Sequence, residues 1–139
     1  MNDKTKIMYN LARMYEFIKD IDDICKEHDN DYMALISNKT TKHAINMCLV
    51  QMGEQSARIR DVDKEFYKAN EDLKLSQIKG MRDRITHSYG DIDYSIIKET
   101  LEKDIPSIKS FIEQTVDKEV LDNPYVLHEV EYDDYVVNK

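Results

Sequence analysis

Apolar residues recur at steps of three and four along most of the chain, the spacing of positions that share one face of an α-helix. One stripe falls within residues 4–27, a second begins after residue 41 and stops before Asp61, and a third begins at Leu73 or Leu75. The stripes consist of Ile7, Leu11, Met14, Ile18, Ile21 and Cys25, then Ile45, Cys48, Leu49, Met52 and Ile59, then Ile78, Met81 and Ile85. They predict three long amphipathic helices.

Polar stretches separate these helices. Residues 28–39 are rich in Asp and Asn around a small apolar patch, which predicts a connection with room for a short helix. Residues 64–69 predict one or two further helical turns. Asp3 is a candidate N-cap for the first helix, and Thr40 or Thr41 for the second.

The third helix is expected to end near Tyr89 and Gly90, because glycine is common just past a helix C-terminus. A fourth helix follows an N-cap at Asp91 or Asp93. Its stripe is Ile97, Leu101, Ile105, Ile108 and Ile112. Pro106 falls inside this stripe, so the helix is predicted to kink or restart there while keeping its direction.

The pattern changes after residue 118. Residues 119–139 carry six acidic residues against one basic residue, and their alternation of Val and Tyr with polar residues is typical of extended chain. A single strand finds no partner in a helical body, so this tail is either disordered or docked on another chain. We predict an all-α up-down bundle of four to five helices over residues 1–118 and a non-helical acidic tail over residues 119–139.

The charge of the chain limits its partners. The 139 residues fit one domain, and the formal net charge is −8. A chain this acidic is not expected to bind nucleic acid by bulk electrostatics. The tail carries about −5 of that charge, however, which leaves a nearly balanced body with room for a local basic site.

Cysteine usage and hydropathy indicate the compartment. Cys25 and Cys48 stand apart, without metal-ligand spacing, and are interpreted as buried thiols in a reducing cytoplasm. The N-terminus has no apolar signal region, and no uncharged apolar run approaches membrane-spanning length. We expect a soluble, cytoplasmic protein with no membrane partner.

The stretch MRDRITHSYGDID gathers polar groups where the third helix must stop. A cluster of basic residues at a helix C-terminus is ordinarily explained by the helix dipole. Here, however, the order is Arg82-x4-His87-x-Tyr89, followed at once by Gly90. On an intact helix, positions five apart point about 140° away from each other. Arg82 and His87 therefore share a ligand only if the helix unwinds near His87 or if a second copy contributes its own motif.

These residue types suit one chemistry. Arginine presents a fork of donors to phosphate oxygens and keeps its charge. Histidine titrates near neutral pH and can move a proton. The pair suffices for RNA cleavage without a metal ion, in which the 2′-hydroxyl attacks the neighbouring phosphodiester.

Two segments carry a resemblance to a known family. The sequence KGMRDRITHSYGDIDYSIIKETLEKDIPSI resembles the core of HepT-type toxins of the HEPN superfamily, and AINMCLVQMGEQSARI is similar to their second long helix. The resemblance implies a homodimeric helical bundle in which Arg82 and His87 are catalytic in an endoribonuclease that needs no metal or cofactor. It also implies a type VII toxin–antitoxin system, in which a nucleotidyltransferase antitoxin of the minimal (MNT) type neutralises the toxin by attaching AMP to Tyr89.

Two acidic residues accompany the motif. Asp83 stands where the family often has Asn, and it can either oppose phosphate or orient Arg82. Glu54, beside Gly53, is a candidate partner of Arg82 or of Arg84, with a solvated helix position as the alternative. The remaining histidines, His28, His43 and His128, are interpreted as surface residues.

Other functions stay open. A non-catalytic helical module of the same fold would use this site to bind a nucleotide, RNA or a partner protein. A phosphotransfer bundle with His87 as acceptor is less favoured, because the lysine and glycine that usually follow such a histidine are absent. Nothing in the sequence distinguishes tRNA from mRNA as the substrate.

Overall fold

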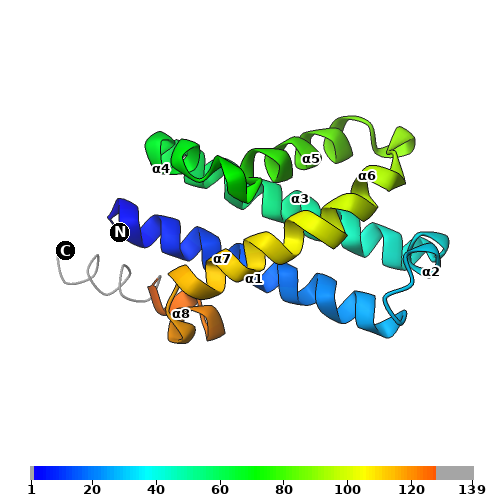
Figure 1. Cartoon of the computed structure of the whole chain (residues 1–139), viewed down its shortest axis with the longest axis horizontal. Helices are drawn as coiled ribbons and strands as arrows, with labels where there is room; N and C mark the ends of the chain where they lie inside the picture. Colours follow the sequence, from blue (N-terminus) through cyan, green and yellow to red (C-terminus); the bar gives the residue numbers. More distant parts are fainter. Residues whose placement is uncertain (1, 128–139) are drawn as a thin grey trace, which may run out of the picture.

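The computed structural model describes residues 2–127, and within them the chain is helical with no β-strand, which confirms the predicted all-α class. Four long passes alternate in direction, as an up-down bundle requires (Figure 1). The passes are formed by α1 (Asp3–Glu27), α3 (Lys39–Val62), α5 (Leu75–His87) and the line of α6 (Tyr94–Glu99), η3 (Thr100–Asp104) and α7 (Ile105–Thr115). Short elements connect or follow them: α2 (Tyr32–Ser37), α4 (Lys64–Ala69), η1 (Glu71–Leu73), η2 (Tyr89–Asp91) and α8 (Lys118–Asp122).

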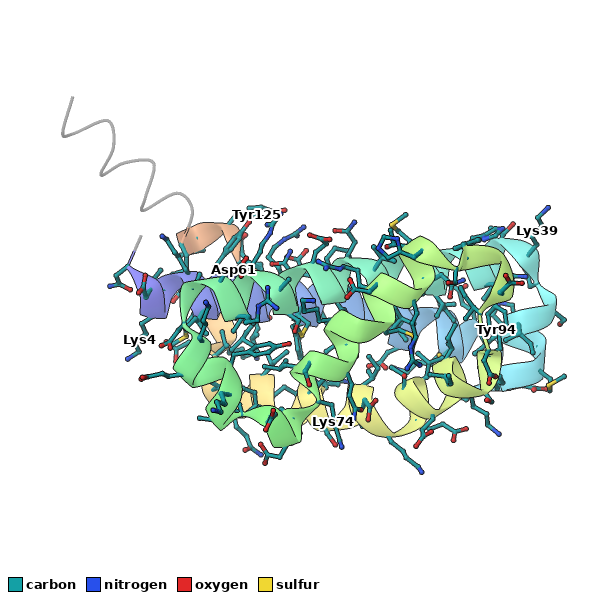
Figure 2. The ribbon with its side chains drawn as sticks, turned by 90° about the horizontal axis from the view of Figure 1, so that it is seen from above. Lys4, Lys39, Asp61, Lys74, Tyr94 and Tyr125 are labelled. Atoms are coloured by element: carbon teal, nitrogen blue, oxygen red, sulfur yellow. The ribbon has the colours of Figure 1, made fainter. Side chains whose placement is uncertain are left out.

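The helix α3 is the centre of the bundle, since it packs against α1 on one side and α5 on the other. The predicted stripes supply the core, and their side chains face one another in its interior. The largest fully buried side chains are Leu11, Met14, Ile18, Ile21, Leu49, Met52, Ile59, Leu75, Ile78, Ile97, Ile108 and Ile112. Lys39 and Tyr94 lie at one end of the long axis, and Lys4, Asp61 and Tyr125 lie toward the other (Figure 2).

Helix starts differ slightly from the predicted ones. Asn2 caps α1 by accepting a hydrogen bond from the Thr5 amide, and Asn38 caps α3 in the same way, so both caps lie before the predicted residues. Asp93, one of two predicted caps, accepts from the Ser95 amide at 2.9 Å and starts α6. Asp93, the last residue of the stretch MRDRITHSYGDID, therefore marks the end of the loop between α5 and α6.

The fourth pass keeps its direction across Pro106, as predicted. The chain passes through one π-helical stretch, Thr100–Asp104, and the Ile105 amide bonds to the Thr100 carbonyl. Pro106 then occupies the first turn of α7, where the fixed φ of proline is compatible with a helix. The wider π turn accommodates the proline without a break.

The prediction of a non-helical chain from residue 119 is wrong for its first residues. Residues 118–122 form α8, which packs against α1, and Leu121 is buried. Val116 and Leu121 place apolar side chains against the bundle, and the Asp117 carbonyl accepts hydrogen bonds from the Val120 and Leu121 amides. The alternating pattern belongs to the sequence further on, and residues 128–139 lie outside the described part of the chain.

The two cysteines are free thiols. Cys48 is buried, and that burial raises the pKa of its thiol to about 11, whereas Cys25 is only half-buried. A thiol with so high a pKa is unreactive at neutral pH. Within residues 2–127 no helix is both long and apolar enough to cross a membrane.

Candidate active site

The site is built on a very close approach of α3 and α5 at Gly53. A Cβ atom added at Gly53 would lie 2.3 Å from Cβ of Arg82 and 3.0 Å from the Ile78 carbonyl oxygen. The Ile78 oxygen is part of the α5 backbone and Arg82 Cβ is bonded directly to it, so neither atom can move away unless the helix itself moves. Glycine at this position therefore lets the two helices touch backbone to backbone.

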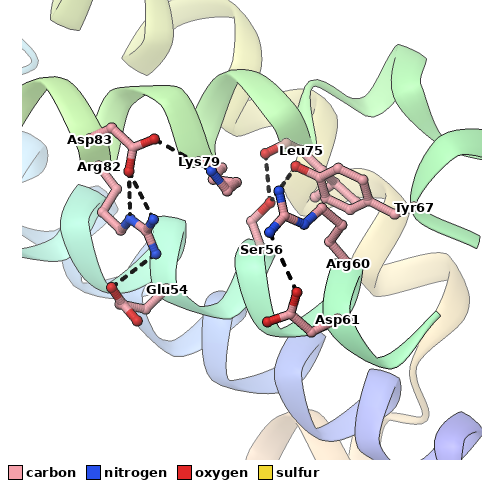
Figure 3. Close-up of polar contacts among 9 residues, drawn as sticks. All are labelled: Glu54, Ser56, Arg60, Asp61, Tyr67, Leu75, Lys79, Arg82 and Asp83. Carbon is pink, nitrogen blue, oxygen red and sulfur yellow. Dashed lines mark hydrogen bonds and ion pairs between the residues drawn. The ribbon is translucent and has the colours of Figure 1, made fainter. Parts of the chain in front are cut away.

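The start of α5 is fixed to the same helix. Ser56 is fully buried, and its hydroxyl donates a hydrogen bond of 2.6 Å to the Leu75 carbonyl (Figure 3). Tyr67 lies beside it, with 3.3 Å between the two hydroxyl oxygens. Since Ser56 and Gly53 are one turn apart on α3, they set both the position and the register of α5.

Arg82 is held by carboxylates from both helices (Figure 3). Its Nη1 donates to Glu54 at 3.0 Å, and its Nε and Nη2 donate to one oxygen of Asp83 at 3.0 and 2.8 Å. Lys79 lies 3.4 Å from the other oxygen of Asp83. The Arg82 side chain is 21% exposed, so the guanidinium is both anchored and reachable from solvent. Of the alternatives predicted for the two acids, Asp83 orients Arg82, and Glu54 pairs with Arg82 instead of Arg84.

The carboxylates change the acidities in this network. The hydrogen bond from Arg82 is the main cause that lowers the pKa of Asp83 below its usual value, with Lys79 adding to the effect. The hydrogen bond to Asp83 likewise raises the pKa of Arg82. Both groups are charged throughout the physiological pH range. A guanidinium has five N–H donors, and the three hydrogen bonds use three, which leaves two for a ligand.

His87 is the last residue of α5 and is exposed. The helix is intact up to that residue, and the Ser88 amide closes it on the Arg84 carbonyl. Arg82 and His87 therefore keep the roughly 140° separation of an unbroken helix and do not converge within one chain. Of the two predicted ways to bring them onto one ligand, unwinding of the helix near His87 is not present in this structure.

Tyr89 lies on η2, just beyond the helix, and contacts α3. Its ring stacks on that of His43 with centroids 5.4 Å apart and planes inclined by 20°. The Tyr89 hydroxyl and Nδ1 of His43 also share a hydrogen bond. Tyr89 as a whole residue remains 42% exposed.

His43 is exposed, as the sequence analysis predicted for this histidine, but its contact with Tyr89 was not predicted. His43, Met47 and Glu54 recur at steps of four and seven, which places them on one face of α3. That face carries one contact to Tyr89 at its beginning and one to Arg82 at its middle. The helical spacing of His43 from Glu54 was the sequence signal that could have indicated that both lie on the same face as the site. Within residues 2–127 no group of three His, Cys, Asp or Glu side chains is placed to hold a metal ion.

Comparison with known proteins places this arrangement in a family. A family model described as "Ribonuclease HepT-like" matches residues 9–115, which include every motif residue discussed above. "Putative RNase MJ0125" of Methanocaldococcus jannaschii is 31% identical over 76% of this chain and 89% of its own length. "Putative RNase MJ1216" of the same organism is 30% identical over 76% and 85%, and "Probable ribonuclease HepT" of Thermococcus cleftensis is 26% identical over 76% and 88%. No solved structure gives a significant match. With most of its length matched, and with the Arg82 network and His87 inside the match, the chain belongs to the HepT-like ribonuclease family.

Proposed function

We propose that this protein is an endoribonuclease that cleaves RNA without a metal ion and that its active site forms between two copies of the chain. The observation that supports the proposal is the pair formed by Arg82 and His87. Arg82 is anchored by Glu54 and Asp83 with two donors left over, and His87 is exposed at the end of the same helix.

The reaction follows from these groups. His87 of one copy accepts the proton of the ribose 2′-hydroxyl, whose oxygen attacks the adjacent phosphorus. Arg82 donates its two remaining N–H groups to the phosphate oxygens and stabilises the negative charge that builds there. The 5′-oxygen leaves with a proton from the second His87. The products are a 2′,3′-cyclic phosphate and a 5′-hydroxyl.

A homodimer is part of the proposal. The exposed surface along α3 and α5 carries Arg82 and Met47, which is 58% exposed, and His87 lies at the end of α5. Pairing this surface with its symmetry mate would bring Arg82 of one copy toward His87 of the other and cover the methionine. Light scattering should report twice the 16.4 kDa of one chain at micromolar concentration. A strictly monomeric protein that still cleaves RNA would contradict the composite site.

We further propose that the protein is the toxin of a type VII toxin–antitoxin pair, acting in the cytoplasm on tRNA or mRNA. A minimal nucleotidyltransferase encoded with it would silence the toxin by transferring AMP to the Tyr89 hydroxyl. The exposure of Tyr89 and the hydrogen bond between its hydroxyl and His43 support this role. Tyr89→Phe should leave cleavage intact and abolish AMP incorporation.

The direct test is cleavage of RNA by purified variants. Arg82→Ala and His87→Ala should each lower the rate by at least about 10²-fold, the usual cost of removing one electrostatic or acid–base group. Arg60→Ala and His28→Ala remove the same residue types elsewhere and should leave the rate unchanged. Activity should persist in EDTA.

Two outcomes would contradict the proposal. Cleavage that EDTA abolishes would place the chemistry on a metal ion. Binding of RNA without any cleavage, under conditions where the dimer is intact, would instead favour the non-catalytic module that binds a nucleotide, RNA or a partner protein.

A further inference from the structure

A second feature of α5 lies on the side that faces away from α3. A groove runs there between α5 and the segment from η2 to α6, and it has two adjoining hollows of about 300 and 340 Å³. Met81, Arg84 and Ile96 line both hollows. The first hollow is closed by Ser88 and Asp91 of the motif loop, and the second opens over Gly80.

The groove has an arginine of a different kind from Arg82. Arg84 is exposed, and within residues 2–127 its guanidinium makes neither a hydrogen bond nor an ion pair. Asp91, across the first hollow, is exposed and its carboxylate is likewise unbonded in the described part of the chain. Its position is nevertheless defined, because its amide donates to the Ser88 carbonyl at 2.9 Å. A ligand here would find one free cation and one free carboxylate.

Gly80 gives an independent indication that something external approaches. A Cβ atom added at Gly80 would meet no atom within 4 Å, so packing inside the chain does not require glycine. A glycine inside a helix costs about 0.5–1 kcal/mol relative to alanine. Its usual justification is the close approach of another backbone or of a ligand, and Gly80 faces the groove.

The size and lining of the groove decide the kind of occupant. Each hollow lies at the small end of the range of ligand sites, too small to receive a helix but large enough for one nucleotide. Met81, Ile92 and Ile96 provide apolar surface for a flat ring, and Asp91 provides acceptors at its edge. Single-stranded RNA is recognised in this way, with an unstacked base held by apolar contacts and read along its edge.

We propose that this groove is a base-binding subsite that takes a guanine of the RNA substrate next to the cleaved phosphate. Guanine presents N1–H and N2–H side by side, and the Asp91 carboxylate accepts both. Arg84 binds the phosphate of that nucleotide, and the open backbone at Gly80 makes room for the neighbouring sugar. Ser88, which lines the first hollow, directly follows His87 in the chain. The inference rests on the proposed ribonuclease function.

Binding of mononucleotides tests the subsite without any cleavage. Purified wild-type protein is titrated with GMP, AMP, CMP and UMP, and amide resonances are followed by NMR. GMP should bind roughly tenfold more tightly than UMP and shift resonances between Gly80 and Ile96. Asp91→Asn should remove the preference for GMP, and Arg84→Ala should weaken the binding of all four nucleotides. Asp61→Asn and Arg60→Ala, at the far end of α3, are the matched controls.

The outcomes separate this inference from the proposed function. If GMP binds at the groove but the dimer does not cleave RNA, the proposed function fails and the subsite stands. If the protein cleaves RNA with equal rates at every base and the four nucleotides bind alike, the subsite is refuted and the proposed function stands. Cleavage of a defined RNA should also show a raised KM, with kcat little changed, in Asp91→Asn.

Discussion

A glycine and an arginine lie on each of the two sides of α5, tightly packed on one side and open on the other. On the α3 side, Gly53 has no room for one more carbon, and Arg82 is bound by two carboxylates. On the α6 side, Gly80 borders open space, and Arg84 has no partner within residues 2–127. The same helix thus has one side fixed by contacts within the fold and one side whose arginine and glycine are left without such contacts in the described residues.

The difference separates two requirements of a site that acts on phosphate. In the proposed mechanism Arg82 must already be in position when the charge develops, and Glu54 and Asp83 hold it there in advance. In the proposed subsite Arg84 is free to adjust to its ligand. The following variants test this contrast, beginning with the largest expected effect.

Gly53→Ala should disrupt the closed side. The added Cβ would overlap Arg82 Cβ and press on the Ile78 carbonyl, so α3 and α5 must separate. Such overpacking costs about 1–3 kcal/mol of unfolding free energy, and it moves the Arg82 fork away from its ligand. Urea denaturation should show the loss of stability, and RNA cleavage should fall with it. A variant with unchanged stability and activity would mean that the close approach is not maintained in solution.

Gly80→Ala should stabilise the protein, whereas Gly53→Ala should destabilise it. Nothing within 4 Å opposes the methyl group, and alanine is the better helix former, so the free energy of unfolding should rise by about 0.5–1 kcal/mol. Thermal denaturation at matched protein concentration should show a melting temperature higher by about 2–4 °C. A destabilised Gly80→Ala protein would indicate that a second chain already occupies the groove.

Asp83→Asn tests the electrostatic part of the closed side and should give the smallest effect. The folded-state pKa of Asp83 lies below the usual value for an aspartate, so this carboxylate stabilises the fold at neutral pH and loses the contribution as pH falls through the folded-state pKa. Because Asp83 is 42% exposed, the contribution is roughly 0.5 kcal/mol. The difference in urea midpoint between wild type and Asp83→Asn should therefore be present at neutral pH and vanish in acid. If the difference in urea midpoint persisted in acid, the effect of Asp83→Asn would come from packing and not from charge.

The sequence pattern predicted the fold well where one helix buries one stripe. Ile18, Leu49, Ile78 and Ile108 follow helical spacing, and each is fully buried. The pattern did not predict α8, because Val120 and Leu121 form too short a run to show a period. Alternation further along the tail dominated the interpretation there.

The sequence named the residues of the candidate site, whose roles stay a prediction, and offered Glu54 as a partner of Arg82, but it gave no sign of the other contacts. The order of Arg82, His87 and Tyr89 can be read along one helix end, since all three lie within eight positions. The contact of Tyr89 with His43 joins positions 46 apart, and the tight contact at Gly53 joins two different helices. Such contacts depend on how α3 and α5 dock, and a single sequence carries no direct signal of that geometry.

The anchoring of Arg82 also has a consequence for how RNA binding responds to salt. The affinity of proteins for nucleic acid falls with salt because each phosphate contact by a free cation releases a counterion. Arg82 and Lys79 already have carboxylate partners. Among the arginines and lysines of residues 79–93, which all belong to the described part of the chain, Arg84 is the one whose side chain is unpaired. One or two such contacts in single-stranded RNA correspond to a slope of about −0.7 to −1.4 in log K against log salt. Substrate recognition by this acidic protein should therefore persist at salt concentrations that dissociate basic RNA-binding proteins.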